Sequence, residues 1–324
     1  MSSTHLLPQI ADIQRDLEQQ HYVTDRAIAT TVYLAMKLRK PVLIEGQAGV
    51  GKTEIAKVLA AALNTDLIRL QCYEGLDANS ALYEWNYPKQ MLHIRLEEAV
   101  GEKHDVRQQE AEIFSEPYLL KRPLLSAISR EDQAPVLLID EVDRADEEFE
   151  AFLLEILSDF QVTIPELGTV RANHRPYVVL TSNRTRELSD ALKRRCLYLW
   201  IDYPDFDKEV RIIETKVDGI NPQLAEQVAG FMQVVRRLRL SKVPGMAESL
   251  DWAMSLMALH ADHLEPDAVT ETLGAILKDR DDVSRLAGAR AEAIVGELNG
   301  LDEEGLRTAP AQIAQRIDKE LVSR

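Results

Sequence analysis

The most constraining feature of this sequence is a glycine-rich segment, Gly46–Thr53, that ends in Lys-Thr. It reads Gly-Gln-Ala-Gly-Val-Gly-Lys-Thr and fits the pattern G-x-x-x-x-G-K-[ST]. The apolar run Val42–Ile44 comes just before it, and the helical pattern Thr53–Leu63 follows it. In such a loop, glycines let backbone N–H groups turn toward phosphate oxygens, and the helix N-terminus adds its positive end. The sequence therefore predicts a phosphate-binding loop between a buried strand and a helix.

The end of this loop supplies the charged and hydroxyl groups that nucleotide chemistry needs. We expect Lys52 to reach the β- and γ-phosphates and the Thr53 hydroxyl to ligate Mg²⁺. A chance match by a glycine-containing turn is the alternative, but it would not account for both the strand and the helix. The predicted phosphate-binding residues are Gly46, Gln47, Ala48, Gly49, Val50, Gly51, Lys52 and Thr53.

A second apolar run delivers two carboxylates. Val136–Ile139 is followed directly by Asp140 and Glu141, and ligands bind at the carboxyl ends of strands in open α/β sheets. We expect Asp140 to hold Mg²⁺ through water and Glu141 to polarise the attacking water. A solvated acidic helix start is the alternative, because further Asp and Glu residues follow as far as Glu150.

Two further polar elements complete the candidate site. Asn183 follows the apolar run Tyr177–Leu180, where an amide suits the positioning of the lytic water and a plain strand cap fits equally well. The short helical stretch Leu188–Arg195 ends in Arg194 and Arg195, whose charges suit a γ-phosphate. Taken alone, these arginines are better interpreted as a solvated helix end that complements the helix dipole.

Apolar runs recur along the first part of the chain with helical patterns between most of them. This alternation predicts an α/β fold with a parallel sheet and helices on both sides. Beyond Pro204 only helical patterns remain, so we expect a helical domain there. The five strand candidates are Val42–Ile44, Leu67–Leu70, Val136–Ile139, Tyr177–Leu180 and Leu197–Ile201.

Charge and cysteine content restrict the partners and the compartment. Lys and Arg number 38 against 54 Asp and Glu, a formal net charge of −16, which disfavours broad binding to a polyphosphate backbone. The two cysteines cannot form a disulfide framework and fit a reducing compartment. The N-terminus lacks the features of a signal peptide, and no apolar run approaches the ~18 residues that cross a bilayer. We expect a cytoplasmic protein with no membrane partner.

Together these motifs resemble an AAA+ ATPase, and within that group the MoxR family, in particular its CoxD-like members. The chain between the second strand and Asp140 is longer than one helix needs, like the family's helix-2 insertion. Gln161–Arg171 reads as a β-hairpin, like the pre-sensor-1 hairpin of one AAA+ branch. The resembling stretches are Leu43–Ala60, Leu70–Arg95, Leu138–Leu167 and Thr181–Trp200.

The resemblance implies an architecture and a division of the chain. It implies a parallel five-stranded sheet flanked by helices, with the insertion and the hairpin, followed by an all-α lid domain. The expected segments are an N-terminal helical arm at 1–22, an AAA+ core at 23–204, a lid at 205–290 and a C-terminal helical tail at 291–324.

The resemblance also implies an ATP- and Mg²⁺-dependent remodelling chaperone that assembles as a ring, commonly a hexamer. Asn183 would be its sensor-1 residue, and Arg195 or Arg194 an arginine finger that acts on the ATP of the neighbouring subunit. MoxR-type ATPases typically work with a von Willebrand factor A-domain protein. CoxD-like members are associated with the maturation of metalloenzymes, which implies a metalloenzyme as one class of protein client.

One departure from the family pattern concerns the lid. AAA+ proteins usually place a sensor-2 arginine at the start of a lid helix, but the matching segment here, Pro244–Trp252, contains no arginine. Either signalling from the lid to the γ-phosphate is weaker, or a nearby basic residue substitutes. The candidates for this substitution are Arg237, Arg239 and Lys242.

Weaker patterns have plain alternatives. Thr215–Asp218 fits the guanine-reading pattern T-K-x-D, but it ends a helical pattern and does not follow a strand, which favours chance. His260 and His263 have no identifiable carboxylate or cysteine partner and are interpreted as solvated or core histidines. Four aromatic residues of the insertion region either contact a partner or pack locally, with packing favoured: Tyr73, Tyr83, Trp85 and Tyr87.

Two other classes of function compete with the chaperone. An AAA+ nucleic-acid motor is disfavoured by the net charge of −16 and by the lack of an appended DNA-binding domain. A nucleotide-dependent switch with negligible turnover is disfavoured by the intact set of motif residues, and the missing sensor-2 arginine keeps it open. Spacing alone does not separate ATP from GTP.

Overall fold

The computed structural model describes residues 9–100 and 105–322. The chain divides into two units, and each has an apolar core of its own. The first unit comprises Met1–Asp16, Asp25–Glu45 and Lys52–Trp200, and the second comprises Leu17–Thr24, Gly46–Gly51 and Ile201–Arg324. The division into arm, core, lid and tail at residues 22, 204 and 290 stays a prediction.

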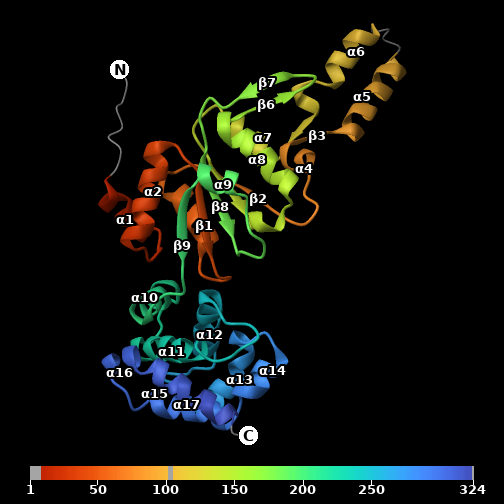
Figure 1. The fold of residues 1–324 in the computed structure, drawn as a ribbon. Helices are drawn as coiled ribbons and strands as arrows, with labels where there is room; N and C mark the ends of the chain where they lie inside the picture. Colours follow the sequence, from red (N-terminus) through yellow and green to blue (C-terminus); the bar gives the residue numbers. More distant parts are fainter. Residues whose placement is uncertain (1–8, 101–104, 323–324) are drawn as a thin grey trace. The chain divides into compact units, whose positions relative to one another are not determined.

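A five-stranded parallel sheet forms the centre of the first unit (Figure 1). Its strand order is β2-β5-β8-β1-β9, which places β2 and β9 at the edges. All five predicted strands are confirmed: β1 (Val42–Gly46), β2 (Leu67–Gln71), β5 (Val136–Asp140), β8 (Tyr177–Ser182) and β9 (Leu197–Ile201). The inner strands β1 and β5 are buried at every position, because helices cover both faces.

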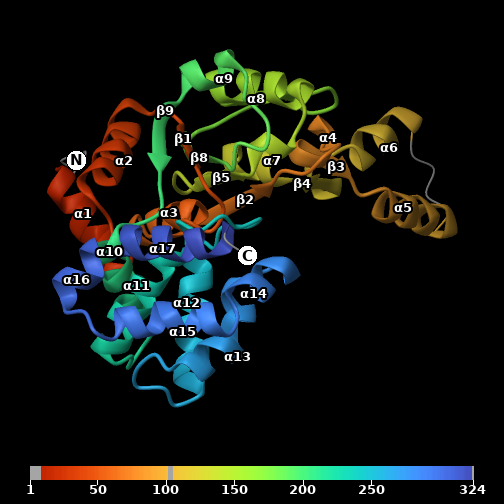
Figure 2. The same cartoon turned by 60° about the horizontal axis from the view of Figure 1, so that its bottom comes forward.

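The two faces of the sheet carry different helices, since successive side chains of a strand point in opposite directions. Leu43 packs into the core that contains residues of α7 (Pro123–Ile128) and α8 (Glu147–Asp159). Its neighbours Val42 and Ile44 instead lie with α2 (Arg26–Leu38) and α3 (Lys52–Ala62). Figure 2 shows α7 and α8 on one side of the strands and α3 on the other.

Side-chain caps fix where the helices begin. Asp25 accepts a hydrogen bond from Ile28 N and starts α2, and Asp146 accepts one from Phe149 N and starts α8. Ser189 caps α9 (Asp190–Arg195) in the same way. The unit also contains most of α1 (Ile10–Gln19), while residues 1–8 of the predicted arm lie outside the described residues. The helices described in the structure include none long and apolar enough to span a bilayer.

The predicted insertion lies between β2 and β5. It begins with α4 (Ala78–Leu82) and a two-stranded antiparallel ribbon, in which β3 (Tyr83–Trp85) pairs with β4 (Leu119–Lys121). Between these strands the chain forms α5 (Tyr87–Val100), α6 (Val106–Ile113) and the short 3₁₀ turn η1 (Glu116–Tyr118), and the two α-helices extend away from the sheet (Figure 1). We call residues 87–113 the helical insertion.

The predicted β-hairpin is also present. Strands β6 (Gln161–Ile164) and β7 (Gly168–Arg171) pair antiparallel just before β8. Gly168 has φ +83°, which a residue with a side chain rarely adopts, so glycine suits the end of this turn. The resemblance to the pre-sensor-1 hairpin therefore holds at the level of backbone structure.

The second unit is helical after β9, as the sequence predicts. One apolar core runs from Phe206 to Ile317, with α11 at its centre and the ring centroids of Phe231 and Trp252 4.9 Å apart. Thr215 lies inside helix α10, which fits the interpretation of T-K-x-D as a chance match. The helices are α10 (Phe206–Lys216), α11 (Pro222–Val235), α12 (Met246–Ala258), α13 (Pro266–Ile276), α14 (Arg280–Leu286), α15 (Ala289–Leu298), α16 (Glu303–Thr308) and α17 (Pro310–Val322).

Candidate nucleotide site

The carboxyl ends of three neighbouring strands gather polar side chains in the first unit. The register pairs Gln71 of β2 with Asp140 of β5, and Ile139 with Leu180 of β8, so Thr181 follows beside Asp140. The helix that begins at Lys52 contacts all three strands. The fold therefore brings Lys52, Thr53 and Asp140 together at the carboxyl ends of these strands.

Asp140 is almost fully buried, and both of its carboxylate oxygens have partners. The Thr53 hydroxyl donates to Oδ1 at 3.0 Å, and the Thr181 hydroxyl donates to the same oxygen. The Arg69 guanidinium pairs with Oδ2 at 2.5 Å. A buried carboxylate held by a cation and two hydroxyls is fixed in orientation.

Glu141 has an unusual backbone and a constrained side chain. Its φ of 54° lies in the left-handed region, and its N–H donates to the Thr181 hydroxyl at 2.9 Å. The Asn183 amide donates to Oε1 at 3.4 Å, and the Gln71 amide donates to Oε2 at 3.2 Å. Arg144 Nε lies 3.1 Å from Oε2. Asn183 and Glu141 are thus in contact, and Gln71 and Arg144 contact the same carboxylate.

A third carboxylate, Asp143, positions the loop that contains Asn183. Its Oδ1 accepts the backbone N–H of Asn183 at 3.2 Å, and its Oδ2 accepts the N–H and hydroxyl of Thr185 at 2.8 and 2.7 Å. Asp143 is buried, so these charge-assisted bonds are shielded from water. This arrangement fixes Asn183 relative to the segment after β5.

Lys52 is the cation of this cluster. Its side chain is buried, and desolvation lowers the pKa of Lys52, while Asp143, Asp140 and Glu141 oppose that shift. A buried ammonium group among three carboxylates matches the task of binding an anionic phosphate chain. We therefore keep Lys52 as the predicted phosphate-binding cation.

The residues present fit a magnesium ion. Mg²⁺ prefers oxygen ligands, and the Thr53 hydroxyl and the Asp140 carboxylate offer oxygens 3.0 Å apart. The acidic field that surrounds Lys52 adds electrostatic attraction for a divalent cation. Thr53 and Asp140 are accordingly the residues that would hold Mg²⁺.

The glycine-rich loop itself, Gly46–Gly51, belongs to the second unit and docks there on the start of α12. The Gly49 carbonyl accepts the N–H groups of Met246 at 2.9 Å and Ala247 at 3.3 Å. Gly49 and Gly51 have φ of +76° and +89°, so both positions need glycine. A Cβ on Gly245 would lie 2.7 Å from the Ala48 carbonyl oxygen, so Gly245 is required for this contact.

The segment Pro244–Trp252, which contains no arginine, takes part in a hydrogen-bond network centred on Arg236. Arg236, whose side chain is 4% exposed, donates to both oxygens of the buried Glu209 at 2.6 and 2.7 Å. It also donates to Ser249 Oγ and to the Pro244 carbonyl, both at 2.9 Å. Of the predicted substitutes for a sensor-2 arginine, Arg237 donates to Gln233 Oε1 at 3.0 Å, and Arg239 and Lys242 are exposed.

The two candidate finger residues lie apart from the Asp140 cluster. Arg194 and Arg195 are exposed in the last turn of α9, and Arg195 donates to the Ser158 hydroxyl at the end of α8. Among the described residues, neither arginine hydrogen-bonds to Lys52, Asp140 or Glu141. An exposed position suits a group that acts on another subunit, and this role stays a prediction.

The sequence interpretation missed several side chains that contact the predicted ones. Gln71 and Thr181 had a usable signal, because each is a polar residue at the end of an apolar run whose neighbour in the sheet is β5. Arg69 had none, since it lies inside a strand pattern and reaches Asp140 only because β2 pairs with β5. Arg236 and Glu209 are far apart in sequence and lacked a motif.

The aromatic residues of the insertion region divide into two groups. Trp85 is buried and makes edge-on contacts with Tyr83 and Phe114, at centroid distances of 6.2 and 5.2 Å. Tyr73 and Tyr87 are exposed. Packing therefore explains the first pair but not the second.

Neither cysteine has the low pKa of a reactive thiol. Burial raises the pKa of Cys72 to about 12, and Asp140 adds to this effect. Burial likewise raises the pKa of Cys196 to about 12. Both thiols are therefore protonated at neutral pH, and both are free cysteines.

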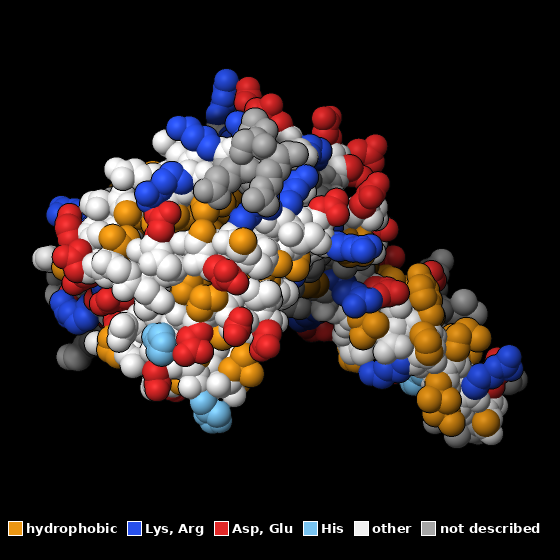
Figure 3. Space-filling model, turned by 90° about the horizontal axis from the view of Figure 1, so that it is seen from below, with side chains coloured by type: hydrophobic (Ala, Val, Ile, Leu, Met, Phe, Trp, Pro, Cys, Tyr) orange, Lys and Arg blue, Asp and Glu red, His pale blue; other side chains and the backbone are white. Residues whose placement is uncertain are grey.

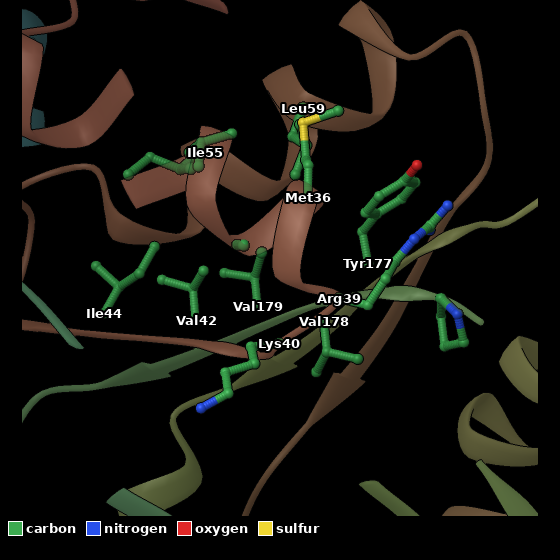
Figure 4. Close-up of a pocket in the computed structure, with 13 residues that line it drawn as sticks. Met36, Arg39, Lys40, Val42, Ile44, Ile55, Leu59, Tyr177, Val178 and Val179 are labelled. Atoms are coloured by element: carbon green, nitrogen blue, oxygen red, sulfur yellow. The ribbon is translucent and has the colours of Figure 1, made fainter. Parts of the chain in front are cut away.

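An apolar pocket at the opposite end of the strands is separate from this site. It is lined by residues of α2 and α3 and by the first residues of β1 and β8, among them Val42 and Tyr177 (Figure 4). Arg39 lies over the Tyr177 ring, 4.7 Å from its centroid. Ligands of open α/β sheets bind at the carboxyl ends of the strands, so we interpret this pocket as a packing gap.

A comparison with known protein families finds a match within this chain. Residues 41–196 match the family model described as AAA domain (dynein-related subfamily). An uncharacterized protein of Staphylococcus haemolyticus is 25% identical over 68% of this chain and 78% of its own length. One from Staphylococcus aureus is 26% identical over 68% and 77%.

Among solved structures, this chain is similar to the RuvB Holliday junction branch migration motor of Thermotoga maritima. The TM-score is 0.44 at 18% identity, covering 81% of this chain and 68% of the motor. A mutant of the same RuvB gives a TM-score of 0.47 at 18% identity, covering 93% and 87%.

Proposed function

We propose that this protein, an ATP-hydrolysing P-loop enzyme whose residues 41–196 match an AAA-domain family model, is a MoxR-type remodelling chaperone. The observation that supports it best is the cluster in which Thr53 meets Asp140 and Asn183 meets Glu141. The helical insertion and the β6–β7 hairpin accompany this cluster, as the resemblance to MoxR proteins requires. These contacts bring together the residues that ATP hydrolysis would need, which supports the proposal.

Each residue of the cluster has a role in this proposal. Lys52 and the loop Gly46–Gly51 bind the phosphates, and Thr53 with Asp140 holds Mg²⁺. When bound, Mg²⁺ supplies positive charge that offsets the charge developing on the phosphates. Glu141 polarises the attacking water, and Asn183 orients Glu141 and that water.

The partners follow from the resemblance and from the charge. AAA proteins typically assemble as rings, and we propose a ring of this chain, a hexamer in the first instance, in which Arg195 or Arg194 reaches the ATP of a neighbour. We propose a von Willebrand factor A-domain protein as the adaptor and a protein client, with a metalloenzyme as the class suggested by the CoxD-like resemblance. The net charge of −16 favours a protein client over a nucleic acid.

A matched pair of variants tests the proposal. Glu141→Gln should bind ATP and barely hydrolyse it, because an amide cannot polarise water as a carboxylate does. Lys52→Ala should lose ATP binding and serves as the control. Tagged Glu141→Gln protein with Mg-ATP should then retain an adaptor and a client that Lys52→Ala protein does not retain.

Three outcomes would contradict parts of this proposal. Retained ATP affinity in Lys52→Ala would remove the phosphate-loop assignment, and near-normal turnover in Glu141→Gln would remove Glu141 from its role. Stimulation of the wild-type ATPase by DNA, without ATP-dependent retention of a protein, would favour a nucleic-acid motor. A wild-type enzyme with negligible turnover in the presence of its retained partner would instead be a switch.

A further inference from the structure

In its described side chains, the helical insertion shows no apolar core of the kind that normally holds two helices together. Among the side chains described in α5 and α6, only Gln90 is buried. Large apolar side chains of α5 are exposed instead: Tyr87, Met91, Leu92 and Leu96. Figure 3 shows hydrophobic side chains on the surface of this part. Small units without a core usually need another source of stability, such as a bound metal.

Polar side chains join the two helices instead. The Gln90 amide donates to the Ile113 carbonyl at 2.6 Å, and the Gln109 amide donates to Glu97 Oε2 at 2.8 Å. His93 Nε2 of α5 lies 3.1 Å from Glu97 Oε1 and 3.4 Å from Glu112 Oε1 of α6. One imidazole and two carboxylates therefore come together between α5 and α6.

The positions of these three groups match a metal coordination sphere. His93 and Glu97 are four residues apart, so they share one face of α5, and Glu112 approaches from α6. Zn–N and Zn–O bonds of about 2.0–2.1 Å in a tetrahedron place ligand atoms about 3.3 Å apart. The two distances from His93 Nε2, 3.1 and 3.4 Å, lie on either side of this value.

The hydrogen bonding of His93 leaves one of its ring nitrogens available as a metal ligand. Within the described part of the chain, His93 Nε2 is a buried atom without a hydrogen-bond partner. An imidazole nitrogen with a free lone pair is a common metal ligand, and carboxylate oxygens complete such sites in proteins.

We propose that His93, Glu97 and Glu112 bind a divalent transition-metal ion, Zn²⁺ in the first instance, which ties α5 to α6. The imidazole nitrogen and one oxygen of each carboxylate are three ligands, and a fourth position remains for water or a partner's side chain. Gln109 holds the second oxygen of Glu97 and thereby orients this ligand. The site is independent of the nucleotide site and goes beyond the proposed function.

Zinc binding to the full-length, nucleotide-free protein tests the proposal by calorimetric titration with ZnCl₂. His93→Gln and Glu112→Gln each remove one ligand with little change in size. Since the loss of a hydrogen-bond partner to a ligand already weakens metal binding by roughly 10–100-fold, we expect at least about 100-fold weaker binding in both variants. Gln109→Ala should bind about 10-fold more weakly than wild type.

A matched control is available in the same chain. His263 Nε2 lies 3.4 Å from Glu265 Oε1, a His–Glu pair that lacks a third ligand. His263→Gln should bind zinc as wild type does. Unchanged circular dichroism and ATPase activity in the His93 and Glu112 variants would show that these proteins are folded.

The alternative chemistry is an imidazolium ion between two carboxylates, which needs no metal. It predicts that wild type binds no zinc at micromolar concentration, or binds it as tightly in His93→Gln and Glu112→Gln as in wild type. Either result would overturn the proposal. Co²⁺ gives a second readout: its visible absorption bands should appear in wild type and be absent in His93→Gln.

Discussion

At the scale of single residues, the orientation of the Glu141 carboxylate depends on the side chains that contact it. Three groups compete for its two oxygens: the amides of Asn183 and Gln71 and the guanidinium of Arg144. Only Asn183 comes from β8's carboxyl end, and the buried Asp143 fixes its backbone. Asn183 is therefore the group best placed to set the direction in which Glu141 presents its carboxylate.

Replacing Asn183 tests this role. Asn183→Ala should lower kcat by about 10–100-fold, because Glu141, which we propose as the water-polarising carboxylate, loses a positioned partner. The dissociation constant for ATP should stay within about twofold, since Asn183 does not belong to the phosphate loop. Steady-state ATPase assays and nucleotide binding measure both effects. Asn173→Ala, an exposed asparagine, is the control, and an equal loss of kcat there would contradict the assignment.

Residue types at the ends of apolar runs were predictable, and their contacts were not. Asp140 and Glu141 follow an apolar run, and Thr53 follows Lys52 in a motif, so sequence alone places them at one site. Arg69 reaches Asp140 because β2 is the strand next to β5, and strand order is a property of the whole sheet. A single sequence holds no local signal for such a contact.

At the scale of elements, the strands and the lid helices were predictable because their apolar patterns face a core. The interior of the helical insertion was not, since its two helices bury only Gln90 among their described side chains and show no apolar stripe toward a partner. The buried pair of Arg236 and Glu209 was hidden for another reason. It joins α10 to the end of α11, and from the sequence alone each of the two charged side chains is expected to lie in solvent.

The contact between the loop and α12 is the element on which ATP binding should depend most sharply. Gly245→Ala places a Cβ 2.7 Å from the Ala48 carbonyl oxygen and 2.9 Å from Gly49 Cα. Both atoms belong to the backbone, so the loop must shift. Its N–H groups then no longer point toward the proposed position of the phosphates. We expect ATP to bind at least about 10-fold more weakly in a folded protein, measured by fluorescent-nucleotide titration.

Gly274→Ala is the matched control for that substitution. Gly274 lies within α13, and an added Cβ there meets no atom within 4 Å. Alanine should stabilise the helix by about 0.5–1 kcal/mol and leave ATP binding unchanged. If Gly245→Ala binds ATP as tightly as Gly274→Ala does, the docked loop does not set nucleotide affinity.

At the scale of the whole molecule, the boundary between the two units falls within the predicted phosphate-binding motif. The glycines of the loop belong to the second unit, and Lys52, the next residue, belongs to the first. A single peptide bond therefore connects the loop that docks on α12 with the cluster around Asp140.

The exposed arginines of α9 extend this argument to the assembly. If Arg195 acts on the ATP of a neighbouring subunit, Arg195→Ala rings and Lys52→Ala rings should each be inactive, for different reasons. A mixed ring contains some interfaces in which an intact Arg195 from a Lys52→Ala subunit faces ATP bound to an Arg195→Ala subunit. Mixing should therefore restore part of the wild-type ATPase rate, with a maximum near equal amounts of the two variants.

Native mass spectrometry establishes that the rings are mixed, and the same series with Arg194→Ala identifies which arginine acts. No recovery in demonstrably mixed rings would place the function of Arg195 within its own subunit, where its contact with Ser158 would be its structural role.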